Sequence, residues 1–293
     1  MKKKMFIALL VAVVIIIGAV INFYSGGKAF PEREPGKLYM YSIDVGQADS
    51  TLILLPDGEN LLIDAGNRED AALLLDFISD RGVEKLDYVI ATHPHEDHIG
   101  SMSEIIENFE IGTFYMPDAV NVTSCYEDMI DSLINENVKV EIAERGLKVK
   151  EGECDIEIIS PLVKEYEELN HVSAVTKITF KDTSFLIMGD AEKINENEML
   201  ENNKKGLEST VLRVGHHGSN TSSSKKFLQA VNPEIAVISV GEGNDYGHPH
   251  EEVVKRIEKL EIPYLRTDES GTILIMSDGE KIEVIEESEV EGK

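Results

Sequence analysis

The 293 residues suffice for one large α/β domain or two small ones, and two cysteines, Cys125 and Cys154, are too few for a disulfide framework. The 55 acidic residues outnumber the 28 basic ones and give a formal charge of −27. Such a charge repels polyanions and attracts cations, which argues against tight, non-specific binding of duplex DNA. It favours divalent metal ions as ligands and leaves short oligonucleotides or small anions as substrates.

The N-terminus has the pattern of a membrane anchor. Three lysines, Lys2 to Lys4, precede an apolar run from Met5 to about Val20, which is just long enough to span a bilayer. The lysines favour a cytoplasmic N-terminus with the rest of the chain outside. We therefore expect residues 1–24 to be a single-pass anchor of an extracytoplasmic protein. A cleaved signal peptide, giving a secreted protein, is the alternative, but no small-x-small cleavage site is evident.

The remaining chain divides into a Gly/Pro-rich linker at 25–37, one domain at 38–278 and an acidic tail at 279–293. Apolar periodicity within the domain predicts alternating strands and helices. The expected strands are 38–45, 50–55, 60–63, 86–91, 111–116, 138–143, 155–159, 174–180, 184–188, 209–214, 235–240, 263–266 and 272–276. The expected helices are 69–80, 101–109, 192–203, 225–230 and 249–260. This order suggests an α/β fold with two sheets face to face and helices outside.

The strongest chemical signal directly follows the strand expected at 86–91. Within Thr92-His93-Pro94-His95-Glu96-Asp97-His98, four residues of metal-ligand type fall in a loop that can turn them toward one point. Imidazoles suit a borderline ion such as zinc, and the carboxylate of Asp97 adds negative charge that balances a second ion. Two ions together can polarise a scissile group and activate water, so the motif predicts a metal-dependent hydrolase.

A second polar run, residues 216–222, follows a strand and precedes the helix expected at 225–230. Amides and hydroxyls at such a place can hold a phosphate-sized anion, and a nearby histidine can bind metal or protonate a leaving group. We expect His216 to be that ligand or proton donor. Substrate contacts are expected from His217, Ser219, Asn220 and Thr221. Ordinary helix capping beside a packed histidine pair is the alternative.

The segment 92–100 resembles the signature of the metallo-β-lactamase-fold hydrolases. Residues 61–66 resemble the strand-Asp-turn element of that superfamily, and residues 187–190 resemble its Gly-Asp element, which carries a metal-bridging carboxylate. Residues 43–50, 212–222 and 239–250 narrow the likeness. They resemble the extracytoplasmic hydrolase domain of ComEC/Rec2-type competence proteins and their stand-alone relatives, over roughly residues 38–276.

The resemblance implies an αβ/βα four-layer sandwich with a two-metal site at one edge, between the sheets. Its expected metal ligands are His93, His95, Asp97, His98, Asp190, His216 and His248, of which Asp97 and His216 are also the expected catalytic residues. Polar residues expected to support these ligands are Asp44, Gln47, Asp49, Asp64 and Asn170. The expected ions are zinc, with manganese as the alternative. His171 lies where many members of the fold place a further ligand, but Asn170 and Ser173 keep the Asn-x-x-Ser pattern of the competence proteins, so its role stays open.

The favoured function is hydrolysis of phosphodiesters or nucleotides outside the cell, with an anionic substrate that includes nucleic acid. Hydrolysis of a lactone, thioester or β-lactam is the alternative, since such a ligand set activates water whatever the substrate. A binding module that kept the fold without activity is a third interpretation. The complete His-x-His-x-Asp-His set argues against that one.

Overall fold

The computed structural model describes residues 30–162, 166–203 and 206–287. The strands are β1 Leu38–Ser42, β2 Thr51–Leu54, β3 Asn60–Ile63, β4 Lys85–Ile90, β5 Glu110–Met116, β6 Lys139–Ile142, β7 Lys148–Lys150, β8 Cys154–Ser160, β9 Val175–Phe180, β10 Thr183–Ile187, β11 Val211–Arg213, β12 Ile235–Ile238, β13 Tyr264–Arg266, β14 Ile273–Ser277 and β15 Ile282–Glu286. The helices are α2 Ala71–Ser79, α3 Glu96–Ile99, α4 Met102–Asn108, α5 Ser124–Asn135, α6 Lys193–Asn203, α7 Lys225–Val231, α8 Glu251–Lys259 and α9 Thr267–Ser270. Short 3-10 turns lie at η1 Arg68–Asp70, η2 Leu169–Val172 and η4 Gly215–Gly218.

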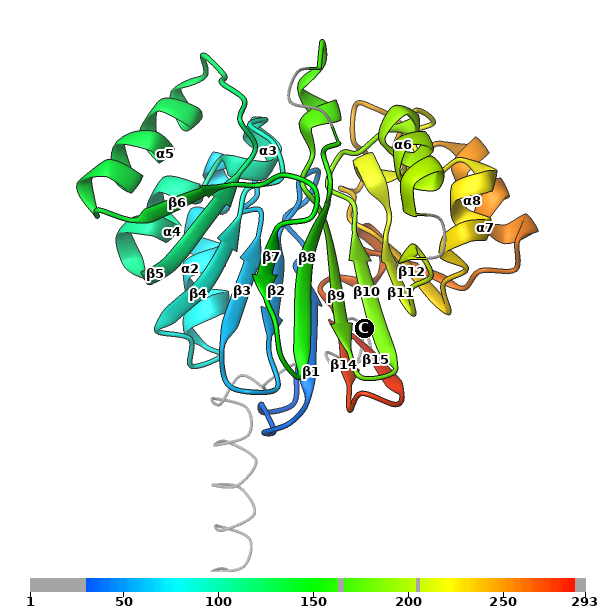
Figure 1. The fold of residues 1–293 in the computed structure, drawn as a ribbon, viewed down its shortest axis with the longest axis horizontal. Helices are drawn as coiled ribbons and strands as arrows, with labels where there is room; N and C mark the ends of the chain where they lie inside the picture. Colours follow the sequence, from blue (N-terminus) through cyan, green and yellow to red (C-terminus); the bar gives the residue numbers. More distant parts are fainter. Residues whose placement is uncertain (1–29, 163–165, 204–205, 288–293) are drawn as a thin grey trace, which may run out of the picture.

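These strands form two sheets that pack face to face (Figure 1). The eight-stranded sheet has the order β15-β14-β1-β2-β3-β4-β5-β6, and the seven-stranded sheet has the order β13-β12-β11-β10-β9-β8-β7. One apolar cluster, which includes Ile53 and Phe185, fills the space between the sheets. The sheets therefore share a single interior, and strands such as β1 have no exposed residue because both of their faces are covered.

Helices cover the outer face of each sheet (Figure 1). A second cluster joins α2, α4 and α5 to the eight-stranded sheet through Leu74, Ile105 and Met129. A third cluster joins the seven-stranded sheet to α7 and α8 through Phe227 and Val253. The two-sheet α/β sandwich expected from the sequence is thereby confirmed.

Parallel pairing brings distant segments of the chain to one edge of this sandwich. Strands β3 to β6 run parallel to one another, and so do β10 to β13. The carboxyl ends of parallel strands lie at the same edge of a sheet, which is where open α/β sheets place their ligands. The loops after β4, β10, β11 and β12 therefore meet, and all of the polar motifs found in the sequence lie in those loops or beside them.

The structure differs from the sequence analysis at several places. The expected acidic tail at 279–293 contains strand β15, because Ile282 and Val284 alternate with acidic residues and pack against the inter-sheet cluster. Part of the expected linker also packs, since Phe30 is buried against Tyr41. Helix α5 and strand β7 were not expected at all. The acidic residues of α5 obscure a buried stripe that includes Met129.

The anchor expected at residues 1–24 lies outside the described residues. None of the described helices is long and apolar enough to cross a membrane. Cys125 and Cys154 are both buried and both free, so no disulfide joins them. They belong to different apolar clusters, Cys125 outside the eight-stranded sheet and Cys154 between the sheets.

Candidate metal centre

The histidine-rich loop after β4 is held in place by the carboxylate of Asp64. The backbone N–H of Thr92 donates to Asp64 Oδ1 at 2.8 Å, and the Thr92 hydroxyl donates to Asp64 Oδ2 at 2.7 Å. The loop then turns into α3, which ends against Gly100. A Cβ on Gly100 would lie 2.4 Å from backbone atoms of Asn67 and Arg68, so only glycine allows this approach. The contacts at both ends fix the direction of the side chains between them.

One group of metal-ligand atoms consists of His93, His95 and Asp190, whose ligand atoms lie within 4.8 Å of one another. His93 Nε2 is 3.0 Å from His95 Nδ1 and 3.8 Å from Asp190 Oδ2. Asp190 comes from the loop after β10, in the other sheet, and follows Gly189. A Cβ on Gly189 would meet Thr92 Cβ at 2.8 Å, so this glycine lets the two loops meet.

A second group consists of Asp97, His98, Asp190 and His217, again within 4.8 Å of one another. His217 Nε2 lies 3.2 Å from Asp97 Oδ2 and 3.7 Å from Asp190 Oδ1. His98 Nε2 lies 3.3 Å from the same Asp190 oxygen. Asp190 thus belongs to both groups and contributes a different oxygen atom to each.

The chemistry of these atoms fits a cation. His98 Nε2 and Asp190 Oδ1 are both buried without a hydrogen-bond partner, although each such orphaned group is costly in a folded protein. The opposite nitrogen of His98, Nδ1, is 2.8 Å from Asp64 Oδ2, to which it can donate. That contact leaves the Nε2 lone pair free to face Asp190, which is the arrangement found around ligating histidines.

A buried ion pair orients His217 in the same way. His217 Nδ1 lies 3.1 Å from the Ser239 carbonyl oxygen and 3.2 Å from Asp49 Oδ1. Asp49 in turn accepts a hydrogen bond from Arg213, whose side chain is almost completely buried. Removing one partner from such a buried pair leaves an uncompensated charge, which typically costs about 3–5 kcal/mol. Asp49, held by Arg213, therefore fixes the orientation of the His217 ring through its Nδ1 atom.

The electrostatics of the centre reflect its crowded carboxylates. Burial opposes the ionisation of Asp97, but the charge of His98 and a hydrogen bond from His217 lower its pKa to about 2. Burial alone would lower the pKa of His217, but the carboxylates of Asp49 and Asp190 raise it to about 10. The carboxylates are thus ionised, and positive charge is needed among them. A divalent cation supplies the same compensation.

His216 lies beside the two groups and belongs to neither of them. Its Nε2 is 3.5 Å from Asp190 Oδ2, while its Nδ1 is 3.0 Å from Thr221 Oγ1 and 3.2 Å from Glu192 Oε1. From the sequence we expected His216, and not His217, to be the metal ligand. In the structure, His217 is the one that lies with the ligand atoms of Asp97, His98 and Asp190. Both residues have positive φ, 52° and 49°, so the chain turns sharply here and sends the two rings in different directions.

The remaining expected histidines surround the centre. The ring of His248 stacks on that of His217 at 6.3 Å, and burial, together with His217 and His216, lowers the pKa of His248 to about 4. His171 Nε2 lies 3.2 Å from Glu192 Oε2. His248 and His171 are absent from the groups of ligand atoms found among the described residues, which also include a third group, Asp49, Asp64 and His98. Asn170 Nδ2 is 3.4 Å from His216 Nε2, so Asn170 faces the centre.

The loop expected to bind substrate uses several of its own donors. Ser219 Oγ lies 3.0 Å from Thr221 Oγ1 and also accepts from the Thr221 backbone N–H. The Asn220 N–H donates to His250 Nδ1 at 2.9 Å. These contacts hold the loop around His216, and they leave fewer donors for an anion than the sequence suggested.

Two expected supporting residues lie in the turn between β1 and β2. Asp44 Oδ1 accepts from the Gly46 N–H at 3.1 Å, and Gln47 Oε1 accepts from the Gly241 N–H at 3.2 Å. Gln47 therefore joins this turn to the loop after β12. Both contacts stabilise loops around the centre and involve no metal-ligand atom.

Sequence reasoning missed Thr92, Glu192 and Arg213. Thr92 adjoins the motif, and its hydroxyl and amide both reach Asp64. Glu192 follows Asp190 by two residues and lies close to both His216 and His171. In the sequence, Arg213 is a basic residue inside a strongly apolar strand. That pattern indicates a buried ion pair but does not identify the acidic partner.

A family profile described as the metallo-beta-lactamase superfamily matches residues 43–242. The chain belongs to the metallo-beta-lactamase superfamily. This membership confirms the fold and the metal-dependent hydrolase activity that the motifs predicted. The number and the identity of the metal ions stay predictions.

Curated relatives confirm the likeness to competence proteins. ComE operon protein 3 of Bacillus subtilis is 30% identical over 79% of this chain and 32% of its own length. Competence protein ComA of Neisseria gonorrhoeae is 30% identical over 84% of this chain and 33% of its own length. Recombination protein 2 of Haemophilus influenzae is 27% identical over 83% of this chain and 29% of its own length. The chain thus spans about a third of the length of these relatives.

Solved structures show the same fold. The metallo-beta-lactamase fold protein YhfI from Bacillus subtilis has a TM-score of 0.53 and 13% identity, covering 78% of this chain and 96% of that one. The diiron β-hydroxylase CmlA from Streptomyces venezuelae has a TM-score of 0.54 and 14% identity, covering 81% of this chain and 53% of that one. At these identities, the likeness concerns the fold alone.

Replacing Asp190 with alanine tests whether the two groups share one carboxylate ligand. We expect the variant to lose metal affinity by at least about 10–100-fold, the effect of removing even an outer partner of a ligand. Metal content after gel filtration, measured by atomic emission, is the readout. Asp182→Ala is the control, because Asp182 is exposed and directly precedes β10, whereas Asp190 follows that strand. Unchanged metal content in the Asp190 variant would remove Asp190 from the site.

Proposed function

We propose that this protein is a metal-dependent phosphodiesterase that acts on nucleic acid or nucleotides. The observation that carries the proposal is the pair of ligand groups, His93-His95-Asp190 and Asp97-His98-Asp190-His217, with one carboxylate common to both. When bound, two neighbouring divalent ions, zinc or manganese, polarise the phosphoryl group, activate water and stabilise the leaving oxygen. Relatives named as competence and recombination proteins support the substrate class.

The chain's own residues hold this centre and supply a proton donor. Asp64 and Asp49 orient His98 and His217 through their Nδ1 atoms, which keeps each Nε2 directed at Asp190. His216 belongs to neither ligand group. Its Nε2 lies near the Asp190 carboxylate and near the side-chain amide of Asn170. We assign His216 the task of protonating the leaving oxygen.

The strongly negative net charge restricts the substrate further. Duplex DNA is bound chiefly through many phosphate contacts with basic side chains, and this chain has 27 more acidic than basic residues. A short or single-stranded substrate needs fewer such contacts. We therefore favour single strands, short oligonucleotides or nucleotide diesters.

A substrate panel tests the proposal. The zinc- or manganese-loaded protein should cleave a single-stranded oligonucleotide or a nucleotide diester, and the Asp190→Ala variant should not. The same preparations should leave a lactone, a thioester and a β-lactam intact, as judged by chromatography of the products. Hydrolysis of one of these three with no cleavage of any phosphodiester would replace the proposed function with acyl-bond hydrolysis.

The role of His216 is testable separately. General acid catalysis contributes about 10²–10⁴-fold to rate, so His216→Ala should lower kcat by that factor while metal content stays at the wild-type level. His171→Ala is the matched control, because His171 also contacts Glu192 but belongs to neither ligand group. It should change kcat by less than about threefold. Loss of metal from the His216 variant would instead make His216 a ligand.

The proposal also places the domain outside the cytoplasm, on the strength of Lys2 to Lys4 and the apolar run that follows them. Protease added to intact cells should then remove the domain while a cytoplasmic control protein survives. Fractionation before digestion should recover the chain with the membranes, or in the medium if residues 1–24 are cleaved. Survival of the domain under conditions that digest a known surface protein would show that this topology is wrong.

A further inference from the structure

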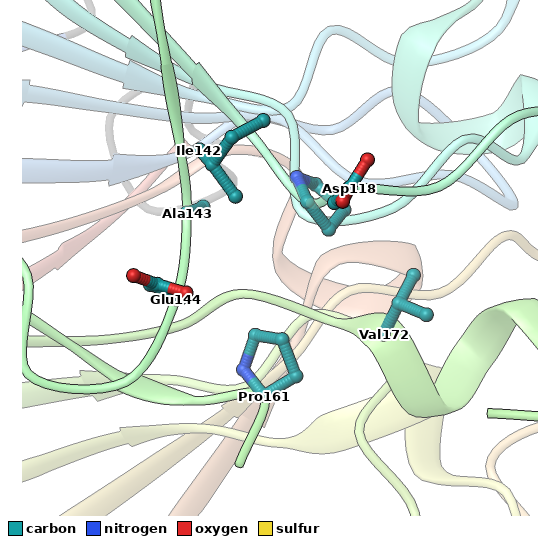
Figure 2. Close-up of a pocket in the computed structure, with 7 residues that line it drawn as sticks. Asp118, Ile142, Ala143, Glu144, Pro161 and Val172 are labelled. Atoms are coloured by element: carbon teal, nitrogen blue, oxygen red, sulfur yellow. The ribbon is translucent and has the colours of Figure 1, made fainter. Parts of the chain in front are cut away.

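A pocket lies between segments that follow β5 and β6 of one sheet and β8 of the other sheet (Figure 2). Its volume is about 150 Å³. The loop after β5, the segment from β6 into the following loop, the end of β8 and η2 supply its walls. The residues that line it are Pro117, Asp118, Ile142, Ala143, Glu144, Pro161 and Val172.

Two hydrogen bonds tie the walls of this pocket to the histidine loop. Asn121, three residues after Asp118, donates from Nδ2 to the carbonyl oxygen of Pro94 at 2.7 Å, between His93 and His95. The N–H of Ala174, two residues after Val172, donates to the Thr92 carbonyl oxygen at 2.9 Å. The segments that form the pocket are therefore attached to the histidine loop on both sides of His93.

The turn η2 makes the same connection from the other sheet. Val172 lines the pocket, and Asn170, on the same turn, lies 3.4 Å from His216 Nε2. A substrate held at the centre beside His216 would thus extend past Asn170 toward Val172. The pocket is placed to receive the group next to the bond that is cleaved.

The lining selects the chemistry of that group. Pro117, Ile142, Pro161 and Val172 offer apolar surface, and Figure 2 shows the Pro161 ring and the Val172 and Ile142 side chains around the opening. A cavity of about 150 Å³ is the size known to hold one benzene ring, so the six-membered ring of a base fits, and the five-membered ring of a purine would remain at the opening. The seven lining residues include two carboxylates and no basic residue. They repel a second phosphate and attract N–H donors.

We propose that this pocket binds the nucleobase next to the scissile phosphate. The base lies between the apolar walls, and Asp118 and Glu144 at the rim accept hydrogen bonds from its N–H groups. Guanine fits best, because its N1–H and N2–H groups are adjacent donors that match one carboxylate, whereas thymine presents two carbonyl oxygens that a carboxylate repels. The inference rests on the proposed function and names the part of the substrate that the enzyme recognises.

Binding of free nucleosides tests the pocket without any hydrolysis. Titration calorimetry with the intact metal-loaded protein should show guanosine binding at least about tenfold more tightly than thymidine, as expected for hydrogen bonds to a charged acceptor. Asp118→Asn should remove most of that preference. Asp131→Asn, an exposed carboxylate on α5 outside the pocket, is its control.

A bulky substitution provides a second and independent probe. Ile142→Trp should fill the pocket and weaken guanosine binding by about tenfold or more, because one ring then occupies the space of the other. Val140→Trp is the matched control: Val140 lies two residues earlier on the same face of β6, and it is 42% exposed against 45% for Ile142. Circular dichroism should show both variants folded. Equal guanosine affinity in the two variants would overturn the proposal.

Cleavage kinetics separate this inference from the proposed function. If phosphodiesters are cleaved, an oligonucleotide with an abasic residue next to the cleaved bond should have a KM about tenfold higher than its guanine-containing partner. Equal KM values would overturn the pocket while leaving the phosphodiesterase intact. If no phosphodiester is cleaved but guanosine still binds and Ile142→Trp still blocks it, the base pocket stands and the proposed reaction fails.

Discussion

The compensation of buried negative charge at one sheet edge is the constraint on which this structure depends. Asp49, Asp64 and Asp190 are each almost fully buried, and an unpaired buried carboxylate would be too costly to keep ionised. The compensating groups come from both halves of the chain: Arg213 for Asp49, and His98 for Asp64 and Asp190. The contacts that hold the sheets together at this edge therefore also assemble the metal ligands.

The sequence was sufficient for the parts of this arrangement that are local. His93 and His98 lie in one short motif after a strand, and apolar runs identified many of the strands because both sheets are covered on two faces. The sequence could not decide whether His216 or His217 is the metal ligand. Both residues have a left-handed backbone conformation, so no periodicity indicates which ring faces inward. The sequence could not predict the ion pair between Asp49 and Arg213 for another reason. The two residues are 164 positions apart, so no local pattern links them.

Amphipathic patterns dominated by acidic residues account for the elements that were missed. Strand β15 and helix α5 both carry at least two acidic residues, a pattern typical of solvent-exposed segments. Their few apolar residues nevertheless pack into clusters: Val284 between the sheets, and Met129 between α5 and the eight-stranded sheet. In a chain with this excess of acidic residues, the exposed positions of an element indicate little, and its apolar minority decides whether it joins the fold.

The two ligand groups offer different numbers of ligands, and this difference distinguishes the two sides of the metal centre. Asp97, His98, Asp190 and His217 offer four ligands, the usual complement of a closed tetrahedral site, whereas His93, His95 and Asp190 offer three. The three-residue group is the one left with room for another ligand, which is the arrangement of sites that engage a substrate. It is also the group tied to the base pocket, because Asn121 holds the Pro94 carbonyl between His93 and His95. The three-residue group and the pocket thus lie on the same side, and we therefore propose that the substrate extends from the metal ligands across Pro94 and not toward His217.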